Sequence, residues 1–326
     1  MTITKPSCTE FLIISLSVTS TIALATYVVG ANAIGKQAYT DQSEILTKRA
    51  DYFTKAKNDL LESITNHLEK PNFKQQSIQI LSSTKRFRPG QVAAKEELNE
   101  KLMTEGVLQT DIEAESISIM TAGAIFSLST DRSKIGRYQP VQNTSTYVDP
   151  DKNESVSLRF FENPTTKKPT TTLAFPIKDN NNKRRGYYAV DINPKSLYDS
   201  MFEADKLVEL SPPERTHAVA YTSLSSITEI YNPVEPEKYP ALKSAGITNG
   251  LTNQKGSYLY LNHSKKPVVG AYQYVPAANM ALLIERDQYE LFRSPRQRLI
   301  KIMVIGSLIS MTGFVGLKWL KAKNSD

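Results

Sequence analysis

Two uncharged apolar runs lie near the ends of the chain. The first covers 11–35, and the second covers 302–317 between Lys301 and Lys318. At 1.5 Å per residue the first run is long enough to cross about 30 Å of hydrocarbon, and lysine side chains can extend the shorter second run to the interface. A cleaved signal peptide remains an alternative for the first run, because 31–33 (Ala-Asn-Ala) has the small-x-small form of a cleavage site. The pattern predicts two spans, 11–35 and 299–317, with tails 1–10 and 318–326 on one side of the membrane.

A helical pattern continues from the first span. Apolar residues recur at helical spacing, with charged residues between them, from Ile45 to Leu68, and Pro71 ends the pattern. This predicts a stalk helix over 36–70, continuous with the span, that packs one face on the domain core and could pair with its twin in a dimer. His67 is expected to be solvated, since charged residues surround it.

Strand patterns dominate the rest. Apolar and β-branched residues separated by turn formers predict strands around 116–136, at 155–161, and in a hairpin whose strands are 170–177 and 186–192. A shorter series comes next, at 217–231 and 256–285, with a helix predicted at 235–245. The predicted fold class is therefore α+β, with a membrane-distal module (71–205) and a membrane-proximal module (206–298), each built on an antiparallel sheet.

The central hairpin resembles that of double Cache domains, the extracytoplasmic sensor domains of chemoreceptors and sensor kinases. The resemblance implies two PAS-like modules, a ligand pocket in the distal one, and a signal passed through the membrane helices. The positions that carry it are Pro176, Asp179, Gly186, Val190, Asp191 and Ile192 in the hairpin, Ser129, Thr130, Asp131, Ile135 and Gly136 before it, and 270–285 in the second module.

The resemblance also implies that Asp191 receives the ammonium group of a ligand. A carboxylate in a buried strand needs a partner, so pairing with Arg184 or Arg185 and a structural hydrogen bond remain open alternatives. Other positions depart from the amino-acid-binding members: 137–154 contains no tryptophan, and Phe161-Glu162-Asn163 stands where Tyr-x-Asp is expected. An arginine beside an aromatic wall suits carboxylates, so a carboxylate- or amine-bearing ligand is expected. The predicted ligand-binding residues are Asp191, Arg159, Phe161, Tyr188 and Tyr147.

Composition narrows the function classes. The net charge is +7, but 40 basic and 33 acidic residues form a mixed surface, which argues against nucleic-acid binding. The excess positive charge is better explained by contact with anionic lipid beside the second span. Cys8 is the only cysteine, so an internal disulfide and a cysteine metal site are excluded. Three scattered histidines suggest neither a metal site nor a catalytic triad, and no phosphate-binding glycine loop is present. We therefore expect a binding protein without a cofactor or catalytic residues, not an enzyme.

The layout also indicates location and partners. Flanking charges do not orient the spans, but an N-terminal uncharged run usually exports the chain after it, so 36–298 is expected outside the cytoplasm, anchored in the inner or plasma membrane. A homodimer, a small-molecule ligand and a cytoplasmic signalling partner are expected, with the output domain separate or missing. Two alternatives remain: a polysaccharide chain-length regulator, whose exported part would be mostly long helices, and an exported structural domain without ligand.

Overall fold

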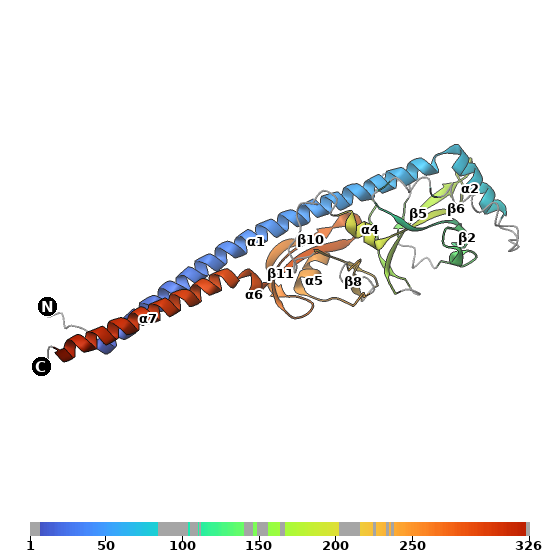
Figure 1. Cartoon of the computed structure of the whole chain (residues 1–326). Coiled ribbons are helices and arrows are strands. Elements are labelled where there is room, and N and C mark those ends of the chain that lie inside the picture. Colours follow the sequence, from blue (N-terminus) through green and yellow to red (C-terminus); the bar gives the residue numbers. More distant parts are fainter. Residues whose placement is uncertain are drawn as a thin grey trace.

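The computed structural model describes residues 7–83, 104, 110, 112–139, 146–148, 156–163, 167–201, 216–223, 226–232, 235 and 238–323. Within these, one long helix carries two sheets in series on one side, and a second long helix returns to the same end (Figure 1). The first residues of the one helix and the last residues of the other therefore lie together, far from the first sheet.

Helix α1 (Cys8–Leu68) runs without a break from the first apolar run to the far end of the molecule. It begins at a capping box, in which the Ser7 hydroxyl accepts from the Glu10 amide at 3.2 Å and the Glu10 carboxylate accepts from the Ser7 amide at 2.5 Å. Helix α2 (Pro71–Ser83) then turns away, since proline is tolerated only in the first turn of a helix. The same helix thus includes the first apolar run and the residues up to Leu68.

Helix α7 (Arg293–Lys323) packs antiparallel to the N-terminal part of α1. Both helices are long and apolar enough to cross a membrane. They approach closely: a Cβ added at Gly306 would lie 2.0 Å from a Thr19 methyl group, and the Ser15 and Ser310 hydroxyl oxygens are 2.5 Å apart. Small residues allow such an approach between membrane helices.

The first sheet holds strands in the order β2-β1-β6-β5-β3, with β4 paired to β5. All pairs are antiparallel except β3 with β5. Helix α4 (Pro194–Asp199) comes directly after β6, and a 3-10 turn, η1 (Arg132–Lys134), after β2. The strands are β1 (Ala114–Thr121), β2 (Phe126–Ser129), β3 (Thr146–Tyr147), β4 (Phe161–Glu162), β5 (Pro169–Lys178) and β6 (Arg184–Ile192).

The second sheet is antiparallel throughout, in the order β8-β7-β11-β10-β9. Helix α5 (Ala245–Leu251) packs on it, and α6 (Gln288–Leu291) connects its last strand to α7. The strands are β7 (Thr216–Tyr221), β8 (Ile227–Glu229), β9 (Lys255–Leu261), β10 (Pro267–Val275) and β11 (Met280–Asp287). A short 3-10 turn, η3 (Pro276–Ala278), joins β10 to β11.

The two sheets share one strand order, although the edge strand β3 runs parallel to its neighbour and its counterpart β9 runs antiparallel. If strands are counted within each sheet and β4 is set aside as lying off the main path, both orders read 2-1-5-4-3. The predicted fold class, a long N-terminal helix with two modules on mainly antiparallel sheets and two apolar helices, is confirmed.

One continuous core ties both sheets to α1. Leu46, Phe53, Leu60 and Ile64 on one stripe of α1 are buried against apolar side chains of both sheets. Helix α1 therefore contributes to the core of both sheets, and α2 also packs on the strands of the first one. The side chains that these sheets contribute include Ile119, Leu173, Phe175 and Val190 from the first and Ala218, Ala271 and Leu282 from the second.

The segment 156–162 joins the two modules. The strand predicted at 155–161 is wrong, because 156–160 is irregular and only Phe161–Glu162 pairs with β5. Instead, the Leu158 amide donates to the Ala277 carbonyl at 2.9 Å, beside β11. The Lys57 ammonium on α1 donates to the Val156 carbonyl at 2.7 Å, and burial lowers the pKa of this lysine. The backbone of 156–160 therefore forms hydrogen bonds to the second module and to α1 instead of the hydrogen bonds of a strand pair.

The helix predicted at 235–245 is also wrong. The described part of that range, 235 and 238–244, is not helical, and the helix begins at Ala245. Pro240 would remove an amide and clash within a helix at that position. The Ser244 hydroxyl accepts from the Ile247 amide at 3.2 Å and so caps the helix that does form.

Candidate functional site

A polar row crosses the outer face of the first sheet, away from α1. Asp191 on β6 is paired in register with Ser116 on β1 and Thr172 on β5. Its carboxylate accepts from the Ser116 hydroxyl at 2.8 Å and from the Thr172 hydroxyl at 2.5 Å. Only 10% of the Asp191 side chain is exposed. A buried carboxylate in this setting requires a cation.

The cation is Lys134, the last residue of η1. Its ammonium forms a short ion pair with Asp191 and also donates to the Ser116 hydroxyl at 2.7 Å. Its position is set by η1, which Asp131 caps through a 3.0 Å bond from the Ser133 amide. Arg184 and Arg185, the protein partners considered for Asp191 on sequence grounds, lie elsewhere. Arg185 binds Asp179 at 2.6 Å, and the Arg184 guanidinium lies 5.1 Å from the Tyr187 ring centre.

The charges around the row influence one another. Partial loss of hydration, and then the negative charge of Asp191, raise the pKa of Glu115, whereas the charge of Lys134 opposes this rise. The hydroxyl of Ser133 lowers the pKa of Asp131 by bonding to its charged form. The outer face thus carries a compact set of opposite charges.

Tyr188 lies on the other face of the sheet from Asp191. Side chains alternate along a strand, and three positions separate the two residues. Tyr188 is fully buried and packs edge-on against Phe73 of α2, with ring centres 5.4 Å apart. Burial strongly raises the pKa of its phenol. The structure therefore does not bring Tyr188 to the polar row.

His67 shares that aromatic cluster. It is 1% exposed, and its ring centre is 4.5 Å from that of Phe73 and 6.1 Å from that of Tyr188. The expectation of a solvated histidine is wrong, because α2 folds back over the end of α1 and covers it.

The remaining predicted ligand residues lie along β5. Phe161 is half-buried and pairs with Thr170, two residues before Thr172. Arg159 is exposed, and its carbonyl accepts from the Thr171 hydroxyl at 2.7 Å. The backbone of Tyr147 in β3 pairs with Ala174. Lys134 was not among the predicted site residues, although it lies three residues after the Ser-Thr-Asp motif of the resemblance.

The outer face of the second sheet is filled by its own tyrosines. The Tyr260 hydroxyl donates to Glu285 at 2.8 Å, and burial, followed by the charge of Glu285, strongly raises the pKa of this phenol. Two glycines make room for the ring: a Cβ at Gly246 or Gly270 would lie 2.4 or 2.5 Å from the Tyr260 hydroxyl oxygen. Tyr258 lies beside it, with ring centres 5.0 Å apart. Side chains of the protein thus take the space over this sheet.

Histidines of the second sheet approach one another. His217 Nδ1 is 2.5 Å from a carboxylate oxygen of the buried Glu229, and the His263 ring centre is 6.1 Å from that of His217. Within the part of the chain that the structure describes, no group of three or more metal-ligating side chains is found.

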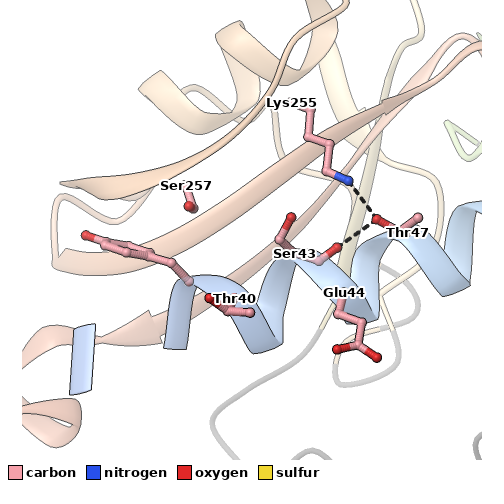
Figure 2. A pocket seen from close by; sticks show the side chains of 7 residues that line it. Thr40, Ser43, Glu44, Thr47, Lys255 and Ser257 are labelled. Carbon is pink, nitrogen blue, oxygen red and sulfur yellow. Dashed lines mark hydrogen bonds between the residues drawn. The ribbon is translucent and has the colours of Figure 1, made fainter. Parts of the chain in front are cut away.

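A polar groove of about 380 Å³ lies between α1 and the edge strand β9, close to the first span (Figure 2). Lys255 reaches across it from β9 and donates to the Thr47 hydroxyl of α1 at 2.8 Å. Thr47 in turn donates to the Ser43 carbonyl at 2.8 Å. The groove is open, and the bond from Lys255 to Thr47 connects β9 of the second sheet to α1.

No known protein family and no curated protein matches the chain. Solved structures that resemble its fold are sensor domains. The sensor domain of histidine kinase DctB from V. cholerae has 10% identity and a TM-score of 0.47, covering 77% of this chain and 98% of that domain. The periplasmic sensory domain of chemoreceptor Tlp1 from Campylobacter jejuni has 13% identity and a TM-score of 0.47, covering 80% and 98%. The ligand-binding domain of chemoreceptor PctB from Pseudomonas aeruginosa, in complex with L-Arg, has 10% identity and a TM-score of 0.45, covering 78% and 97%.

Proposed function

We propose that the chain is an extracytoplasmic sensor: residues 36–298 bind a small molecule outside the cytoplasm, and the two spans carry the signal to an output protein on the other side. The observation that carries this proposal is the direct connection of two modules to both spans. Helix α1 enters the membrane without a break after packing on both sheets, and β11 leads through α6 directly into α7.

This architecture supports transmission through packed contacts. Segment 156–162 links the first sheet to the second, and α1 is packed against both. A shift of the first sheet would therefore press on both the helix and the second sheet. A ligand can shift such an equilibrium only by binding one arrangement more tightly than the other.

We assign ligand binding to the outer face of the first sheet, around Asp191. Its polar groups converge on one carboxylate, whereas the outer face of the second sheet is filled by tyrosines. Phe161, Arg159 and Tyr147 remain predicted ligand residues beside the polar row. Tyr188 is left out, because it faces α2.

A thermal-shift screen of the full chain in lipid nanodiscs against small metabolites tests the ligand. A compound at 100 times its dissociation constant should stabilise the native state by about 2.7 kcal/mol. We expect Asp191→Asn to abolish the shift while the protein stays folded, and Asp179→Asn, on the same hairpin, to keep it. If Asp191→Asn keeps the full shift, the ligand binds elsewhere; if no compound shifts the melting temperature, an exported structural domain becomes the better interpretation.

The chain-length regulator makes a different prediction about size. Such proteins form large rings, whereas a sensor is monomeric or dimeric, and we expect two copies of this chain to associate. Besides α1, the described part of 36–298 is built on one six-stranded and one five-stranded sheet, whereas that of a regulator would be mostly long helices. Light scattering of the detergent-solubilised chain distinguishes the two assemblies, and a large ring would refute the sensor proposal.

A further inference from the structure

We infer that Lys134 is a built-in occupant of the cation position at Asp191, so that the outer face of the first sheet selects against ligands with a primary ammonium group and favours a ligand that offers a hydrogen-bond acceptor. This inference rests on the proposed function for the location of the ligand, and it specifies the ligand's chemical class.

Asp191 already has partners within the chain. Its carboxylate receives two hydroxyl hydrogen bonds, from Ser116 and Thr172, and one ammonium group, from Lys134. An incoming ammonium would meet this ammonium before it reached the carboxylate. Because Lys134 is tethered through η1, it competes at a high effective concentration without needing to be captured from solution.

The turn that follows Lys134 holds this residue in place. Along the chain, the Lys134 carbonyl accepts from the Arg137 amide at 2.9 Å, and the Gly136 amide donates to the Phe126 carbonyl on β2 at 2.8 Å. Gly136 has a φ of 79°, a left-handed conformation that glycine adopts without strain. The turn after η1 is therefore closed tightly onto β2, and this directs the lysine side chain back across β1.

Lys134 has one N–H group beyond the two that bind Asp191 and Ser116. An ammonium has three N–H groups. Among the described residues, Ser116 and Asp191 accept two of them, and 26% of the side chain remains exposed. The ammonium also lies 6.0 Å from the centre of the Phe126 ring. An acceptor on a ligand, such as a carboxylate oxygen, would replace this weaker contact for the third N–H, because charge-assisted hydrogen bonds are the strong ones.

Truncation and chemical rescue test the inference on the full chain in nanodiscs. Lys134→Ala removes the carbons and nitrogen that n-propylammonium reproduces. We expect n-propylammonium to raise the melting temperature of Lys134→Ala in a saturable manner, to leave that of the wild type unchanged, and to have no effect on the double variant Lys134→Ala/Asp191→Asn. Tetramethylammonium, which has no N–H donor, should not rescue.

The outcomes separate clearly. The inference is overturned if the wild type responds as strongly as Lys134→Ala, if the double variant keeps the response, or if a folded Lys134→Ala shows none. Should Lys134→Ala fail to fold, Lys134→Ser, whose hydroxyl lets water reach Asp191, is tested in the same way. No metabolite is needed, so failure of the metabolite screen and failure of this rescue are distinguishable.

Discussion

Replacing Gly186 by alanine tests the packing on which the central hairpin depends. A Cβ at Gly186 would lie 2.2 Å from the backbone carbonyl oxygen of Met120 on β1 and 2.8 Å from a methyl group of Leu81 on α2. The carbonyl cannot move without disturbing the β1–β6 pairing, in which Gly186 is opposite Thr121. Gly186 is thus the position where β6, β1 and α2 meet without room for a side chain.

Two opposing effects determine how much Gly186→Ala changes the free energy of unfolding. Overpacking a well-packed site costs about 1–3 kcal/mol, whereas replacing glycine by alanine reduces the entropy of the unfolded chain and returns about 0.4–1 kcal/mol. The difference between these effects is a net loss of about 0–2.6 kcal/mol. Because the Met120 carbonyl cannot move away, we expect a loss of about 2 kcal/mol, which lowers the melting temperature by about 4–8 °C in a domain of this size.

The assay is thermal unfolding of the 36–298 fragment, followed by far-UV circular dichroism because Trp319 lies outside the fragment. The fragment contains all residues of the three clusters that fill the two sheets. Gly123→Ala is the matched control, since its Cβ would meet nothing closer than 3.8 Å, and it should stay within about 0.5 kcal/mol of the wild type. A Gly186→Ala fragment that melts at or above the wild-type temperature would refute the reasoning.

Three further predictions concern other parts of the molecule. Tyr260→Phe removes the hydroxyl that donates to the buried Glu285 carboxylate on β11 and should lower the free energy of unfolding of the fragment by about 2 kcal/mol. An unchanged denaturation midpoint would contradict the hydrogen bond. Hydrogen bonds from the backbone are the main cause that holds the pKa of Asp179 below its usual value. The contribution of Asp179 to the free energy of unfolding is therefore present above about pH 3.9 and is lost as the pH falls through the lower folded pKa. A pH series of melting curves should show Asp179→Asn less stable than the wild type at pH 7 and equal to it in strong acid. In the membrane, cysteines at Ser15 and Ser310, in a background without the native cysteine, should cross-link, and Gly306→Val should reduce the yield by pushing the spans apart; equal yields would argue against their close packing.

Much of the fold was predictable because its signals are local. The uncharged runs, the helical spacing along α1 and the alternation in the hairpin each depend on neighbours in the chain. The helix predicted at 235–245 failed on a local signal that was present, since Pro240 argues against it. The strand predicted at 155–161 failed for a non-local reason, because its backbone bonds instead to Ala277 and Lys57.

The site was harder to predict, because its partners are distant in sequence. Asp191 needed a cation, but nothing local indicated that Lys134, 57 positions earlier, would supply it. The position of Tyr188 could have been predicted, because an odd spacing from Asp191 places the two on opposite faces of a strand. The burial of His67 could not, since it depends on where α2 folds back.

The unbroken course of α1 limits how this protein can respond to anything bound at its far end. Sixty-one residues of helix form a rod about 90 Å long. A hydrogen-bonded rod resists stretching, so a disturbance at the tip can arrive at the bilayer only as sliding, rotation or tilt. Tilt is a lever motion, and a small change in angle at the second sheet becomes a larger sideways excursion at the opposite end.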